Sequence, residues 1–162
     1  MGEIILSGNK PGVLGKIVEL HGLYYDENWQ LGVIFEAKVA HVLADFLLRF
    51  NPTCDGFWTA WDGDTFVGTI SIDGKDGDTL GARLRAFIIH PDYHGRGIGH
   101  LLMKAALHFC DRVGYKRVYL TTFKGLAAAH HLYVQYGFKL VHEAEDTSWG
   151  VVLPEQEWER IN

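Results

Sequence analysis

The stretch from Leu84 to Cys110, LRAFIIHPDYHGRGIGHLLMKAALHFC, most constrains how this chain of 162 residues can fold. An apolar, β-favouring segment around Ile88 ends at Pro91, which is typical of a turn. Glycines then alternate with other residues, and apolar side chains recur at helical spacing as far as Val113. The sequence therefore predicts a core strand that runs through a glycine-rich loop into a helix packed on a sheet.

Such a junction between a strand and a helix is suited to binding phosphate. The first N–H groups of a helix have no backbone partner, and the helix dipole places partial positive charge there. Gly95, Gly97 and Gly99 allow a close approach, and Arg96 adds a permanent cation. His100 stands where a Walker loop needs Lys and where the dinucleotide fingerprint needs Gly, so neither of those phosphate loops fits.

The loop from His94 to Gly99, HGRGIG, resembles the acetyl-CoA motif of the GNAT family of N-acetyltransferases. That motif reads Gln/Arg-x-x-Gly-x-Gly/Ala, and His94 stands here where Gln or Arg is usual. The N-terminal segments GKIVELHGLYY and FEAKVAHVLADF further resemble the acetyltransferase half of bacterial winged-helix regulator fusions.

A second block, Val118 to Leu140, resembles the family's A-x-x-L-Y helix and the Gly-Phe pair that follows it. Leu126 occupies a position where the family often has Asn. The residues that match the pattern are Ala129, Leu132, Tyr133, Gly137 and Phe138.

Hydrophobic periodicity predicts one domain over residues 1–162, with the element order β-α-α-β-β-β-α-β-α-β-β. This is the order of the GNAT fold, an α/β (α+β layered) architecture in which a mixed central sheet is flanked by helices. The expected strands cover residues 4–6, 56–61, 65–72, 80–90, 118–122, 138–143 and 148–153, and the expected helices cover 14–24, 32–50, 98–113 and 126–136.

The composition of the chain limits the classes of molecule that it is expected to bind. A net charge of −5 without a basic run argues against nucleic acid and mildly favours a cationic substrate such as an amine. No apolar run is long enough to span a bilayer, and the N-terminus does not read as a signal peptide. Cys54 and Cys110 lie far apart and read as reduced, buried thiols of a cytoplasmic protein, with a disulfide as the alternative. The histidine spacing predicts no metal site.

The resemblance implies an acetyl-CoA-dependent N-acetyltransferase, an acyltransferase that needs no metal. The acetyl group would pass to a primary amine of a small molecule, or to an exposed amino group, by direct attack in a ternary complex. The central strand must part from its neighbour so that its edge can pair with the pantetheine arm. The residues expected to bind the cofactor are Phe87, Ile88, Ile89, His94, Gly95, Arg96, Gly97, Ile98, Gly99 and His100.

Tyr133 is the candidate acid that protonates the departing thiolate, because a phenol with a pKa near 10 stays protonated at pH 7. The base that deprotonates the amine is open: Glu36 is the first candidate, and Glu19, His21 and Asp73 are alternatives. The aromatic residues Tyr24, Tyr25 and Trp29 either wall the acceptor pocket or pack between a helix and the sheet.

A second function stays open at this point. His94 and Leu126 depart from the family pattern, as they would in a non-catalytic acyl-CoA-binding module that serves sensing or interaction. GNAT-like domains often pair, so the resemblance also allows a homodimer. A structure decides which of these side chains come together.

Overall fold

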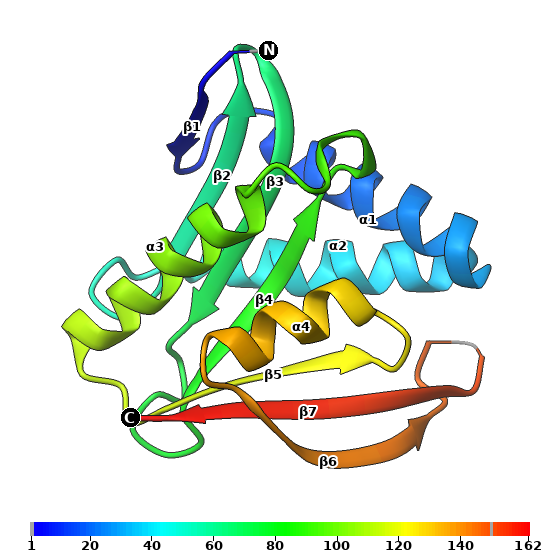
Figure 1. Ribbon diagram of the computed structural model, residues 1–162. Coiled ribbons are helices and arrows are strands. Elements are labelled where there is room, and N and C mark those ends of the chain that lie inside the picture. The colour runs from blue at the N-terminus through cyan, green and yellow to red at the C-terminus, as the bar shows by residue number, and fades with distance from the viewer. Residues whose placement is uncertain (1, 150) are drawn as a thin grey trace.

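The computed structural model describes residues 2–149 and 151–162 and contains a seven-stranded sheet with helices on both faces (Figure 1). The strand order is β1-β2-β3-β4-β5-β7-β6. Along the chain the elements are β1 (Ile4–Ser7), α1 (Val13–Trp29), α2 (Gly32–Leu48), β2 (Gly56–Asp62), β3 (Thr65–Asp73), β4 (Ala82–Ile89), the 3₁₀ turn η1 (Pro91–Tyr93), α3 (Ile98–Val113), β5 (Arg117–Phe123), α4 (Ala127–Gln135), β6 (Lys139–Asp146) and β7 (Leu153–Ile161).

The predicted element order and the mixed sheet are confirmed. β4 and β5 run parallel, and the other neighbouring strands are antiparallel. The β2–β3 hairpin turns where the sequence predicted, at Gly63, which takes φ = 58°. Gly114 ends α3 at φ = 91°, the left-handed conformation that glycine adopts without strain.

Two helical layers enclose the sheet (Figure 1). The apolar stripe of α3, which includes Ile98, Leu102 and Ala106, packs on one sheet face together with Tyr133 of α4. On the other face, Ile17 of α1 is fully buried in a second cluster with residues of α2, β2 and β3. The two layers hold β4 in the middle of the sheet, with its end pointing at the glycine loop.

The last predicted strand is misplaced: it was expected over residues 148–153, of which residue 150 lies outside the described part of the chain. Ser148, Trp149 and Val152 precede β7, which begins only at Leu153 and lies between β5 and β6. β7 alternates: Gln156 and Trp158 are buried, while the glutamates at positions 155, 157 and 159 take the opposite face. Because every second residue of this segment is a glutamate, the sequence did not indicate that it forms a strand whose other face packs in the core.

Both cysteines are free thiols, as predicted, but only Cys110 is buried, whereas Cys54 is half-buried. No helix within the described residues has the length and apolar character needed to cross a membrane.

Candidate active site

A gap between β4 and β5 forms the centre of the site. The two strands pair only at Ala82 with Val118 and at Arg83 with Tyr119, although both strands continue for several residues beyond these pairs. The edge of β4 is therefore open over its second half, which is the parting that acetyl-CoA binding requires.

A bulge in β4 redirects the strand at the gap. Ser71 of β3 pairs with Arg85, but Thr69 pairs with Ile88, so two residues of β4 oppose one residue of β3. Ala86 lies in this bulge at φ = 53°, an unusual conformation for a residue other than glycine. Bulges re-aim side chains, and here Phe87 turns toward the α3 layer while Ile88 turns toward α1.

Beyond the bulge, the backbone of Ile89 faces the gap. The N–H of His90 donates to the carbonyl of Val67 at 2.8 Å, so the alternating residue Ile89 points its N–H and C=O away from β3. His94, which stands in the place of the usual Gln or Arg, uses its Nε2 to contact the Ile89 carbonyl oxygen at 2.9 Å. The edge carries backbone groups that a ligand amide can reach once this histidine moves aside.

The glycine loop leads directly into α3. Gly95 and Gly97 adopt φ = 77° and 80°, and an added Cβ at either position would meet no atom within 4 Å. The first bonded amide of α3 is that of Leu101, which donates to the carbonyl of Gly97, so the preceding amides of the first turn remain available. The loop is a cradle of free N–H groups with open space in front of it.

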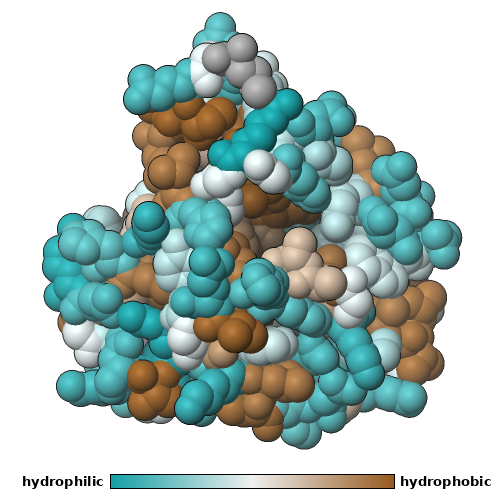
Figure 2. Space-filling view, in the orientation of Figure 1, coloured by the Kyte–Doolittle hydropathy of each residue, from teal (hydrophilic) through white to brown (hydrophobic). Residues whose placement is uncertain are grey.

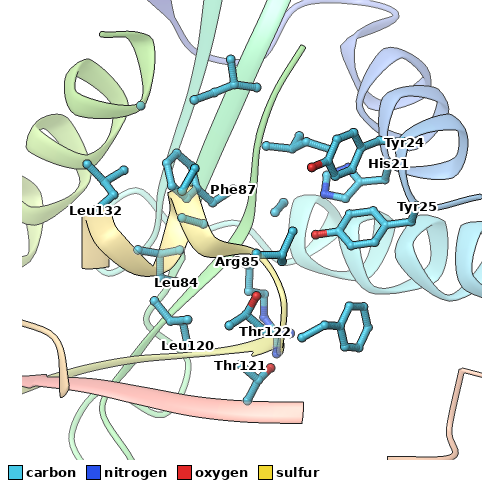
Figure 3. A pocket seen from close by; sticks show the side chains of 18 of the residues that line it. His21, Tyr24, Tyr25, Leu84, Arg85, Phe87, Leu120, Thr121, Thr122 and Leu132 are labelled. Carbon is cyan, nitrogen blue, oxygen red and sulfur yellow. The ribbon is translucent and has the colours of Figure 1, made fainter. Parts of the chain in front are cut away.

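A cavity of about 840 Å³ joins the loop to the gap. It opens as a hollow with apolar walls in the space-filling view (Figure 2). In the close view, Tyr24 and Tyr25 of α1 face Phe87 and Leu132 across it, and Arg85 and Thr121 lie at another side (Figure 3). The cavity thus has walls from both helical layers.

Most of the residues predicted to bind the cofactor line this cavity, and Arg96 does not. The Arg96 guanidinium lies over the ring of Tyr93, 4.8 Å from the ring centre. The predicted residues that do line the cavity are Phe87, Ile88, Ile89, His94, Gly95, Gly97, Ile98, Gly99 and His100.

Tyr133 also lines the cavity, although its side chain is almost fully buried. Its ring lies 6.3 Å from that of Phe87 and 6.0 Å from that of Trp158. Burial, with the nearby Tyr25 hydroxyl adding to the effect, raises the pKa of Tyr133 above the ordinary phenol value. The side chain therefore stays protonated at neutral pH and can donate a proton.

The predicted aromatic cluster lines the opposite wall. Tyr25 stacks on Trp29 at 5.4 Å between ring centres, and Tyr24 meets Tyr25 edge to face at 5.3 Å. All three side chains line the cavity, and Tyr25 also packs on Phe35. This wall of the cavity is consequently aromatic.

The structure does not bring the first candidate base, Glu36, to the cavity. Glu36 is exposed on α2 beside Gly22 of α1, and Glu19 is exposed on α1; neither lines the cavity. Asp73 is held by Arg49 and Arg85: burial alone would raise its pKa, but the hydrogen bonds from Arg49 lower it to about 2. A carboxylate stabilised in this way is a poor proton acceptor.

His21 does line the cavity, but its environment disfavours the protonated ring. Burial lowers the pKa of His21 to about 4, and its Nδ1 lies 2.8 Å from the carbonyl oxygen of Ile17. A base with so low a pKa removes a proton from an ammonium group only weakly.

Glu155 of β7 is the residue that the sequence reasoning missed. Of the described residues that line the cavity, it alone has a carboxylate. Burial raises its pKa, and so does the neighbouring Asp146, whose carboxyl group lies close to it. The alternation of glutamates along residues 155–159 was the signal that could have placed it on one face of a strand.

Among residues 2–149 and 151–162, no three His, Cys, Asp or Glu side chains gather in a way that could hold a metal ion.

Comparisons with known proteins agree with this geometry. The model of the acetyltransferase (GNAT) family matches residues 15–138. Mycothiol acetyltransferase of Geodermatophilus obscurus is 33% identical over 104 residues, which cover 62% of this chain and 32% of the relative. This chain therefore spans about a third of that enzyme's length.

Other relatives match over nearly their whole length. Spermine/spermidine N(1)-acetyltransferase of Bacillus subtilis is 24% identical over 159 residues, covering 94% of this chain and 96% of the relative. Among solved structures, yncA of Salmonella typhimurium with its cofactor acetyl-CoA superposes with a TM-score of 0.74 at 13% identity, covering 99% of this chain and 94% of the other. At this identity the structural likeness shows the fold.

Proposed function

This chain belongs to the acetyltransferase (GNAT) family, and from that premise we propose that it transfers the acetyl group of acetyl-CoA to a primary amine. The observation that carries the proposal is the joining, in one cavity, of an open glycine loop, an unpaired strand edge and the Tyr133 phenol. The name of the Bacillus subtilis relative supports a nitrogen atom as the acceptor.

The residues present fit acetyl-CoA. The free amides at the start of α3 and the open space over Gly95 and Gly97 suit a diphosphate. The gap-facing N–H and C=O of Ile89 suit the amide groups of a pantetheine arm, and the side chain of His94 would leave the Ile89 carbonyl to admit it. When bound there, acetyl-CoA supplies an activated acetyl thioester.

Direct attack by the amine is the mechanism that these residues support. Cys110, the one buried thiol among the described residues, lies within the α3 core and does not line the cavity, and burial raises its pKa to about 12. It is therefore a poor nucleophile. Holding the amine and the thioester together can instead contribute roughly 7–11 kcal/mol to the rate.

Two side chains manage the protons in this proposal. Tyr133 donates to the sulfur as it leaves, because its raised pKa keeps the phenol protonated. Glu155 accepts the proton of the amine, directly or through a water molecule, since forming a neutral amine of pKa about 10.4 at pH 7 otherwise costs roughly 4–5 kcal/mol. One backbone N–H within residues 87–89 that faces the gap would stabilise negative charge at the acetyl oxygen.

The aromatic side chains of Tyr24, Tyr25 and Trp29 would form the wall against which the body of the acceptor lies. The proposal treats residues 1–162 as a single acetyltransferase domain acting in the cytoplasm on a diffusible amine or an exposed amino group. It also allows a homodimer, which light scattering of the purified protein would detect.

One assay tests the proposal. The purified protein is incubated with acetyl-CoA and a panel of amines; thiol release above background hydrolysis, together with an acetylated amine in the mass spectrum, is the expected result. CoA binding without release on any amine would instead favour an acyl-CoA-binding module. Failure to bind CoA would contradict both functions.

A further inference from the structure

The acceptor side of the cavity carries cations that the thioester chemistry does not use. Along β4, Ala82 and Leu84 are buried in the α3-side core, so the alternating residues Arg83 and Arg85 face the α1–α2 side. Both arginines line the cavity, and so does Lys38 of α2. A protein with a net charge of −5 has thus placed three basic side chains around one hollow.

The diphosphate of CoA does not account for the two arginines. The glycine loop follows the far end of β4, and the six residue-to-residue steps from Arg83 to Ile89 correspond to roughly 20 Å of strand. The cradle amides and the arginines therefore lie at opposite ends of β4. Any ligand group bound at the arginine end would therefore be one other than the diphosphate.

The two arginines have different partners. Arg85 donates to the carboxylate of Asp73 at 3.2 Å, a carboxylate that it shares with Arg49. Arg83 donates to the hydroxyl of Thr121 at 2.9 Å, and within the described part of the chain no carboxylate lies within 4.0 Å of it. The positive charge of Arg83 lowers the pKa of Glu155 from a distance, without a direct ion pair, and the carboxyl group of Asp146 lies next to Glu155.

Arg83 consequently has donors left for a ligand. A guanidinium group offers five N–H donors in a planar fork that matches a carboxylate, and Thr121 occupies one nitrogen while fixing the orientation of the fork. The contact joins β4 to β5 just beyond their last backbone pair, so the fork sits where the gap begins.

We propose that the acetyl acceptor is an amine that also carries a carboxylate, and that Arg83, oriented by Thr121, binds this carboxylate while Glu155 faces the amino group. The inference rests on the proposed acetyltransferase function. A diamine or polyamine would instead bring a second ammonium group toward Arg83 and Arg85, where like charges repel.

Matched pairs of acceptors test the inference on the unaltered protein. Phenylalanine is compared with phenethylamine, β-alanine with propylamine, and lysine with cadaverine; phosphoethanolamine tests whether a phosphate can replace the carboxylate. For at least one pair we expect the carboxylate-bearing member to have a kcat/KM at least ten-fold higher. Equal kcat/KM within every pair, or a higher value for cadaverine or spermidine, would overturn the inference while acetyl transfer itself stands.

Variants then locate the recognition. Arg83→Gln should raise KM at least ten-fold for the preferred carboxylate-bearing amine and change it less than two-fold for the carboxylate-free partner. Arg112→Gln, an exposed arginine of α3 outside the cavity, is the matched control and should change neither. Equal effects of Arg83→Gln on both members of the pair would contradict a role in binding the carboxylate.

A binding measurement separates the inference from turnover. Calorimetric titration of the CoA-bound protein with the N-acetylated, unreactive product should show binding that Arg83→Gln weakens at least ten-fold. Arg83→Lys, which keeps the charge but loses the fork, should weaken it by less, and it serves as the second variant if Arg83→Gln does not fold. Unchanged affinity of the folded Arg83 variant for the acetylated product would overturn the inference. Absence of acetyl transfer to every amine would instead overturn the proposed function.

Discussion

The ring of Tyr133 lies 6.3 Å from the ring of Phe87, with the two planes at 52°. This contact places the phenol of α4 beside the bulged part of β4, the segment whose edge is open. A proton donor on one element is thus fixed relative to a binding edge on another.

Tyr133→Phe should lower kcat ten-fold or more and leave the affinity for CoA within two-fold. The substitution removes the acidic hydroxyl and keeps the ring that packs on Phe87 and Trp158. Steady-state kinetics and a CoA titration measure the two effects. Tyr115→Phe is the control, since the Tyr115 hydroxyl donates to the Cys54 carbonyl and does not line the cavity. An unchanged kcat in Tyr133→Phe would remove Tyr133 as the acid.

Gly97→Val should weaken CoA binding at least ten-fold, because the branched side chain would fill the open space in front of the loop. Gly114→Val is a matched control at the other end of the same helix. Both glycines have positive φ, 80° and 91°, and open space around the missing Cβ, so both variants should lose a similar stability, about 1–2 kcal/mol. Equal CoA affinity in the two variants would argue against the loop as the diphosphate site.

Glu155→Gln should lower kcat/KM for the amine roughly ten- to hundred-fold at pH 7. The deficit should shrink toward pH 9, because a larger fraction of the amine is then already neutral. Glu157→Gln, two residues along the same face and paired with Arg117 outside the cavity, is the control. A pH-independent loss in Glu155→Gln would indicate that Glu155 positions the substrate and does not act as the base.

His21 should make the protein less stable in mild acid. Burial lowers its pKa to about 4 in the folded chain, whereas the unfolded chain has the ordinary value near 6.5. Below pH 6.5 the unfolded state therefore binds a proton that the folded state does not, and the free energy of unfolding falls as the pH drops toward 4, by roughly 3 kcal/mol in total.

Urea unfolding between pH 7.5 and pH 4.5 measures this dependence. His21→Gln should flatten it, while His108→Gln, at an exposed position of α3, should leave it as in the unaltered protein. If His21→Gln keeps the full slope, the acid sensitivity comes from other groups.

The sequence predicted those parts of the fold that local chemistry determines. Gly63 and Gly114 mark a hairpin and a helix end because only certain backbone conformations close those turns. The glycine loop and the stripe of α3 were visible for the same reason, since each depends on residues close together along the chain. The order of elements followed from these signals.

Long-range pairing was not visible. Ala86 adopts a positive φ where the register of β3 and β4 shifts. An alanine in the sequence gives no signal of such a shift. The last strand was predicted too early in the sequence because Pro154 and the glutamates after it are not typical of a strand. A proline is nevertheless tolerated near the beginning of a strand. Glu155 was missed together with that strand, and Glu36, the first candidate base, lies exposed on α2 outside the cavity.

The two-pair junction of β4 and β5 also has a thermodynamic consequence. Each backbone hydrogen bond contributes about 0.5–1.5 kcal/mol net, so continuing the ladder along the rest of these strands would strengthen a fold whose kind is stable by only about 5–15 kcal/mol. A redesigned protein in which β4 and β5 paired along their whole length would unfold at a higher temperature, but it would lack the open strand edge at which the reactants bind. The native chain is thus less stable than it could be because the gap between β4 and β5 stays open. Laboratory selection for heat resistance alone should tend to close this gap.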